Sequence, residues 1–123
     1  MDRYQELLHD LREPSVSLRH AIPDTWGAFV ALHRQALADG VVPASLKEAV
    51  ALAIGVVKRC DGCIAFHARA AARAGATPEQ VAELLGVALL MDGAPATVYG
   101  PRAWEAFLHF RSEAQPAPAG GDA

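Results

Sequence analysis

The sequence lacks the features that would place the protein in a membrane, in a secretory route or on nucleic acid. No stretch free of Asp, Glu, Lys and Arg exceeds nine residues, whereas a membrane span needs about 18 or more apolar residues. The first residues mix charges and so lack the basic start and apolar block of a secretory signal. The net charge is -3 and the basic residues are scattered, which is not the pattern of a nucleic-acid binder. We expect a cytoplasmic protein with no membrane or nucleic-acid partner.

Cysteine is scarce as well, because the chain has only Cys60 and Cys63. A pair three residues apart cannot close a long loop, so a fold stapled by several disulfides is excluded. Such a pair indicates redox chemistry or metal binding instead.

Strand patterns are rare in the sequence, while 26 of its 123 residues are alanine, the strongest helix former. The length fits one domain. Apolar spacing and the placement of Gly and Pro predict an all-α bundle of about six helices. The third and fourth helices, near residues 45–58 and 63–74, should form a central hairpin. We assign residues 1–22 to an N-terminal helix ending before Pro14 plus a linker, residues 23–112 to the core domain and residues 113–123 to a disordered tail.

Two segments, Ala49–Val57 and Leu84–Met91, are apolar on nearly all sides. So much apolar surface in a small chain suggests burial against other subunits, and we expect a homo-oligomer. The alternative is that both segments fill the core of a monomer.

The cysteine pair lies where the fourth helix should begin. Free backbone N–H groups and the helix dipole favour a thiolate there, and CxxC thiols at such positions commonly have a lowered pKa. His67 follows Cys63 by four residues, so nucleophile and base share one helix face. Cys60 is near enough to resolve an oxidised Cys63 as a disulfide. The spacing describes a reversible dithiol/disulfide cycle.

Other interpretations of these residues compete with that one. The cysteines could be inert core residues. Cys60, Cys63 and His67 could be zinc ligands, although a structural zinc site takes four and no second pair exists. A c-type haem is excluded because Ile64, not histidine, follows the second cysteine. We expect no cofactor and no metal.

Glu48 is the next candidate, and it has two interpretations. Ser45 and Glu48 fit an S-x-x-E capping box, which would make Glu48 a helix cap. In an antiparallel hairpin, however, Glu48 would also come near His67, where a carboxylate could orient the imidazole. His9, His20 and His33 have no partner that the sequence identifies, so we interpret them as surface or capping residues.

The pattern Glu48-x11-Cys60-x-x-Cys63-x-x-x-His67 resembles the active-site signature of AhpD-like alkylhydroperoxidases, in the carboxymuconolactone decarboxylase superfamily. The resemblance covers about residues 24–110 and fits short, single-motif members. It implies an AhpD-like all-α fold around a helical hairpin, and trimers or hexamers. It also implies that Cys63 attacks peroxide, that Cys60 closes the disulfide, and that His67 and Glu48 relay the proton. The decarboxylase branch lacks the cysteine pair.

These observations lead to one main hypothesis, a cytoplasmic thiol-dependent oxidoreductase of peroxidase or disulfide reductase type. It would act on a small organic hydroperoxide or disulfide and take electrons from a thiol reductant. One alternative is a non-enzymatic redox sensor or structural oligomer. A decarboxylase is a further alternative, and it would have to work without the thiols.

Overall fold

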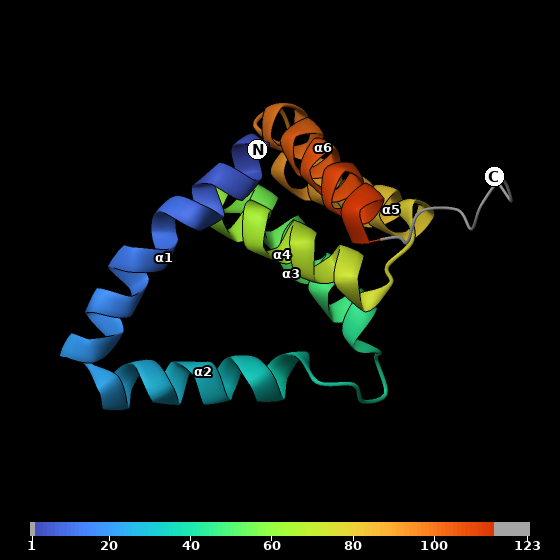
Figure 1. Ribbon diagram of the computed structural model, residues 1–123. Coiled ribbons are helices and arrows are strands. Elements are labelled where there is room, and N and C mark those ends of the chain that lie inside the picture. Colours follow the sequence, from blue (N-terminus) through green and yellow to red (C-terminus); the bar gives the residue numbers. More distant parts are fainter. Residues whose placement is uncertain (1, 115–123) are drawn as a thin grey trace, which may run out of the picture.

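The computed structural model of the protein describes residues 2–114, which form six α-helices and no strand (Figure 1). This confirms the all-α prediction for that part of the chain. The expected disordered tail of residues 113–123 is wrong at residues 113 and 114, which belong to the last helix, and the part of it from residue 115 onward lies outside the described residues. The helices are α1 (Arg3–Ala21), α2 (Pro23–Leu37), α3 (Ala44–Val57), α4 (Asp61–Ala74), α5 (Pro78–Asp92) and α6 (Ala96–Ala114).

The centre of the fold is the hairpin of α3 and α4, as the sequence predicted, with α5 and α6 packed against it. Small side chains dominate the contact surfaces, because alanines of α3, α4 and α6 lie fully inside. Short side chains let the helix axes approach closely. The larger buried residues Leu52, Ile64 and Phe107 fill the remaining space. The core therefore fixes α3 and α4 firmly against each other.

Helix ends follow the capping rules. Thr77 and Gln80 form a reciprocal capping box at the start of α5, with Pro78 in the first turn. Gly75 ends α4 in the left-handed region, with φ of 93°. The chain turns sharply there and begins α5 three residues later.

The prediction that the first helix ends before Pro14 is wrong, since α1 continues to Ala21 and replaces the expected linker. Proline removes one helical hydrogen bond and crowds the carbonyl four residues earlier. Here Pro14 and its neighbours are exposed, so water can reach the carbonyl that the missing N–H leaves free. The cost is thereby reduced, and the basic residues Arg19 and His20 in the last turn favour a helix that extends this far.

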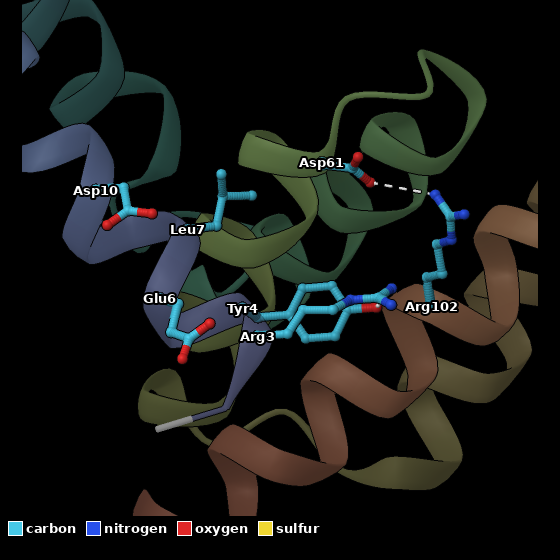
Figure 2. Close-up of a pocket in the computed structure, with 7 residues that line it drawn as sticks. All are labelled: Arg3, Tyr4, Glu6, Leu7, Asp10, Asp61 and Arg102. Carbon is cyan, nitrogen blue, oxygen red and sulfur yellow. Dashed lines mark hydrogen bonds and ion pairs between the residues drawn. The ribbon is translucent and has the colours of Figure 1, made fainter.

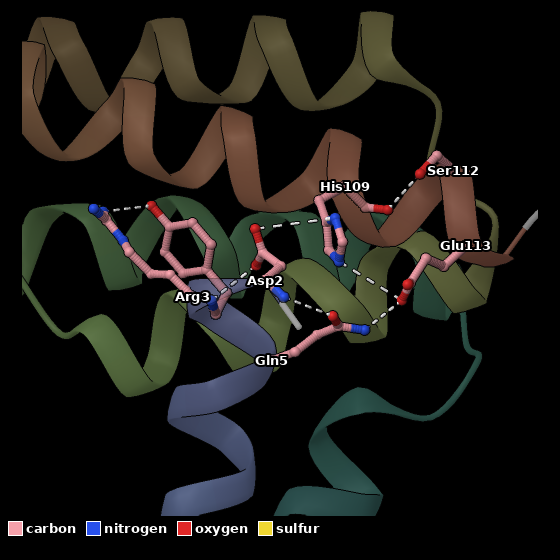
Figure 3. Close-up of polar contacts among 7 residues, drawn as sticks. Asp2, Arg3, Gln5, His109, Ser112 and Glu113 are labelled. Carbon is pink, nitrogen blue, oxygen red and sulfur yellow. Dashed lines mark hydrogen bonds and ion pairs between the residues drawn. The ribbon is translucent and has the colours of Figure 1, made fainter.

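The N-terminal end of α1 is tied to the C-terminal end of α6 by polar contacts (Figure 3). Asp2 and Gln5 form a capping box. The Gln5 amide nitrogen donates to Glu113 at 2.5 Å, and His109 lies 4.0 Å from Asp2 and 3.7 Å from Glu113. Together with the buried Tyr4, these contacts attach α1 to the bundle.

Beyond that attachment, α1 leads away from the bundle and α2 runs back toward the start of α3 (Figure 1). No residue of α2 is fully buried, and its apolar side chains Phe29 and Leu32 are more than 60% exposed.

Among the described helices, none is long and apolar enough to cross a membrane.

The packed interior predicts a large effect for Phe107→Ala. Phe107 is fully buried and its ring stacks on Trp104 with centroids 6.4 Å apart. Truncation should lower the free energy of unfolding by about 3–5 kcal/mol, measured by urea denaturation. Val41→Ala, at an exposed loop position, is the control and should change it by less than about 0.5 kcal/mol. Equal effects of the two changes would contradict this core assignment.

Candidate active site

The turn between α3 and α4 places the two cysteines. Arg59 adopts the left-handed conformation, with φ of 53°, and its N–H donates to the Val56 carbonyl at 3.1 Å. The N–H of Cys60 donates to the Gly55 carbonyl, also at 3.1 Å. This pair of bonds is a Schellman motif, which ends α3 and delivers Cys60 directly to the start of α4.

Arg59 itself serves this turn. Its guanidinium donates to the Val57 carbonyl at 3.1 Å and lies 3.2 Å from Asp92 at the end of α5. It therefore caps α3 and joins the turn to a neighbouring helix. These contacts account for the arginine beside Cys60 without a role in the chemistry.

Cys60 and Cys63 form a disulfide, with Cα atoms 5.2 Å apart. Cys60 is the N-cap of α4, and its sulfur accepts a hydrogen bond from the Cys63 N–H at 3.2 Å. Both side chains are half-buried, so they are held firmly yet remain within reach of solvent. The disulfide fits a redox role for the pair.

Gly55 on α3 is a requirement of this arrangement that the sequence interpretation missed. A Cβ built at Gly55 would lie 3.3 Å from the Cys63 Cβ and 3.5 Å from the Ile64 backbone nitrogen. The first of these contacts is tighter than ordinary packing, so a larger residue would shift the Cys63 side chain and α4 outward. A glycine near the end of an apolar helix, three residues before the turn begins at Lys58, was the only available signal.

Glu48 and His67 face each other across the hairpin. The His67 Nδ1 lies 2.8 Å from Glu48 Oε1, and the two side chains are only 17% and 12% exposed. A carboxylate only accepts hydrogen bonds, so Nδ1 is the donor in this pair, and in the neutral imidazole the lone pair is then on Nε2. His67 follows Cys63 by one turn on the same helix face.

The capping-box interpretation of Glu48 is wrong. Helix α3 begins at Ala44 with Pro43 as N-cap, and the side chain that accepts its first N–H is that of Asp39, bonded to the Ala44 N–H at 2.7 Å. Ser45 lies inside the helix, so Glu48 is not at the position that a capping box requires. Its carboxylate is committed to His67 instead.

The sequence interpretation of His33 as a surface or capping residue is wrong too. His33 of α2 is half-buried, with its ring nearly parallel to that of His67 at a centroid distance of 6.1 Å. The Phe66 ring packs edge-on against both, at 5.5 Å from His33 and 5.1 Å from His67. Tertiary contact between α2 and α4 creates this cluster, and no local spacing in the sequence pointed to it.

A cavity of about 500 Å³ opens between α1, α4 and α6 (Figure 2). Asp61, which stands between the cysteines, lies 3.6 Å from Arg102. Behind them Arg3 donates to the Tyr4 hydroxyl at 3.0 Å. Burial raises the pKa of Tyr4, and the hydrogen bond from Arg3 offsets part of that effect. The cavity reaches the turn between α3 and α4 through Asp61, and neither cysteine lines it.

The zinc interpretation finds no support in the geometry. Within residues 2–114, no group of three or more His, Cys, Asp or Glu side chains is arranged to hold a metal ion. The two sulfurs are bonded to each other, and the nearby imidazole is paired with a carboxylate.

Comparison with known proteins agrees with this fold. Residues 23–106 match the model of the carboxymuconolactone decarboxylase family. A solved apo structure of a carboxymuconolactone decarboxylase family protein from Legionella pneumophila superposes with a TM-score of 0.86 at 33% identity, over 90% of this chain and 99% of that one.

Two curated relatives are themselves described as uncharacterized. One, from Cupriavidus necator, is 40% identical over 87 residues, which span 71% of this chain and 77% of the relative. The other, protein 4 in the cox locus of Paracoccus denitrificans, is 37% identical over 76 residues, or 62% and 68% of the two chains. With a family model that spans most of the helical bundle and a solved relative that reproduces its fold, the chain belongs to the carboxymuconolactone decarboxylase family.

Proposed function

We propose that the protein is a thiol-dependent oxidoreductase that reduces small organic hydroperoxides through a Cys60–Cys63 dithiol/disulfide cycle. The observation that carries the proposal is the disulfide at the start of α4, one helical turn before a histidine that is paired with a buried glutamate. Decarboxylation does not require a disulfide at the site, and an inert structural disulfide does not require a base one turn away.

The cycle starts with the reduced pair. His67 Nε2 takes the proton of the Cys63 thiol, and the imidazolium is held by Glu48. The thiolate attacks the distal oxygen of R–O–O–H, so an S–O bond forms as the O–O bond breaks. The products are Cys63 sulfenic acid and an alkoxide, and the alkoxide takes the proton from His67 to leave as R–OH.

Cys60 then completes the first half of the cycle. Its thiol attacks the sulfur of the Cys63 sulfenic acid, forms the disulfide and releases water. The Cys63 N–H that bonds to the Cys60 sulfur at 3.2 Å favours Cys60 as the attacking thiolate. A dithiol reductant next returns two electrons and two protons by thiol–disulfide exchange. Overall, one hydroperoxide and one dithiol give one alcohol, one water and one disulfide.

The test is steady-state consumption of cumene hydroperoxide in the presence of excess dithiothreitol. We expect many turnovers per chain and a protein disulfide that reappears whenever the reductant is exhausted. Oxidation of each chain once, with no further turnover despite reductant, would contradict the proposal. That result would favour the redox sensor that the sequence left open.

We further propose that the protein acts as a homo-oligomer, a trimer or a hexamer. Apolar side chains of α3 and α5 line a groove of about 270 Å³ with almost no polar surface. Around it Ile54, Val87, Leu90 and Met91 are 50–80% exposed. Monomeric proteins rarely expose apolar patches of this extent, and a second copy of the chain would cover them.

Leu90→Glu should therefore shift the protein to a smaller assembly, as measured by light scattering after size-exclusion chromatography. A charge at a residue that is 80% exposed in one chain is harmless to folding but costly inside an apolar interface. Ser112→Glu, at an exposed polar position of α6, is the control and should leave the mass unchanged. A wild-type protein that elutes as a monomer would contradict the proposal.

A further inference from the structure

His33 has a nitrogen that the structure leaves without a partner. Its Nε2 is sealed from solvent and accepts or donates no hydrogen bond among the residues that the structure describes. A buried polar atom without a partner costs about 1–3 kcal/mol, so nearly all such atoms in folded proteins are paired. His109 Nε2 shares this status, but Glu113 lies 3.7 Å from it.

The position of His33 within α2 is one where packing alone does not require a histidine. Helix α2 has one narrow half-buried stripe, made by Trp26, His33 and Leu37. Its other positions are exposed. An aliphatic side chain would pack on Phe66 without an unpaired polar atom. A histidine in the middle of this stripe therefore needs a chemical reason rather than a packing one.

The neighbours of His33 belong to the reacting centre. Its ring faces the His67 ring at 6.1 Å, with an angle of 20° between the planes, and Phe66 holds the edge of both rings. His67 is in turn one helical turn from Cys63. The His33 ring thus contacts two rings, those of Phe66 and His67, and its Nε2 is left without a partner among the described residues.

We propose that His33 binds the departing oxygen of the hydroperoxide, with Nε2–H donating a hydrogen bond to it. This inference rests on the proposed function. When the Cys63 thiolate attacks the distal oxygen, the O–O bond breaks and negative charge grows on the other oxygen. His67 supplies the proton for that oxygen, while His33 keeps its own proton and stabilises the charge. Two electrons pass from the sulfur to the peroxide, and the substrate supplies the missing partner of Nε2.

The test compares two reactions of the pre-reduced protein, freed of reductant. One is the rate of thiol oxidation by cumene hydroperoxide, and the other is the rate of alkylation of Cys63 by iodoacetamide in Cys60→Ser backgrounds. Both need the Cys63 thiolate, but only the first has a departing oxygen. His33→Phe keeps an aromatic ring and removes the donor. We expect it to slow oxidation by about 100-fold and to change alkylation by less than about twofold.

Further variants separate the outcomes. His33→Gln retains an N–H donor and should recover part of the oxidation rate, and it replaces His33→Phe if circular dichroism shows that the latter does not fold. His20→Phe, at an exposed position of α1, is the matched control and should behave as wild type. Unchanged oxidation in His33→Phe would overturn the assignment, and so would an equal loss in both reactions, which would show that His33 merely holds His67 in place. A wild-type protein that hydroperoxide does not oxidise would instead overturn the proposed function itself.

Discussion

Cys63→Ser will lower the rate of reaction with hydroperoxide at least about 10³-fold, whereas Cys60→Ser will keep the first step of that reaction. The asymmetry follows from the two sulfurs' surroundings. His67 stands one turn beyond Cys63 on α4, while Cys60 is the helix N-cap and accepts the Cys63 N–H. Only Cys63 has a base on its own helix face. A serine hydroxyl is far less nucleophilic toward peroxide oxygen and cannot store an oxygen atom as a sulfenic acid.

Mass spectrometry of pre-reduced protein, mixed with one equivalent of hydroperoxide and no reductant, checks this prediction. The wild type should lose two hydrogens as its disulfide forms. Cys60→Ser should gain one oxygen atom, held as a sulfenic acid that dimedone traps. Cys63→Ser should keep its mass over the same period. Because the helix start also favours a thiolate at Cys60, the converse pattern is chemically reasonable, and its appearance would transfer the attacking role to Cys60.

The fold was largely predictable because the local signals agreed with each other. The capping box at Thr77, the glycine after α4 and the break at Gly93 each fix a helix end by backbone chemistry that acts over a few residues. Pro14 failed as a signal for a physical reason. Its effect on a helix depends on whether solvent can reach the freed carbonyl, and solvent exposure is a property of the tertiary structure.

The candidate site was predictable to the extent that one helix carries it. Cys60, Cys63 and His67 are related by helical spacing, and a hairpin was enough to bring Glu48 near them. The location of His33 at the site was not predictable. It depends on the directions of α1 and of the loop before α3, which together bring α2 to the site. Gly55 was missed since its role is the absence of a side chain opposite Cys63, which only the packed hairpin reveals.

Glu48→Gln should lower the rate of hydroperoxide reduction by about 10²- to 10³-fold while it changes stability little. Glutamine has nearly the same shape and can still bond to His67 across the 2.8 Å contact. It removes the negative charge that stabilises the imidazolium, and its NH₂ group can donate to Nδ1. A donor there would place the His67 proton on Nε2, the atom that must act as base. The loss should therefore appear in the chemical step, measured as the rate of Cys63 oxidation in single-turnover experiments.

Two comparisons distinguish this chemical role from a structural one. Glu83→Gln, an exposed glutamate of α5, removes the same charge away from the site and should leave the rate unchanged. The thermal unfolding of Glu48→Gln should stay close to that of wild type, because the hydrogen bond between α3 and α4 survives. Glu48→Gln with wild-type activity but a lowered melting temperature would show that the pair only fastens the hairpin. We expect the reverse, lowered activity with a nearly unchanged melting temperature. The Glu48 carboxylate is only 12% exposed, so it bears a desolvation cost that a neutral amide would avoid. Its charge is useful to His67 only when His67 itself becomes charged.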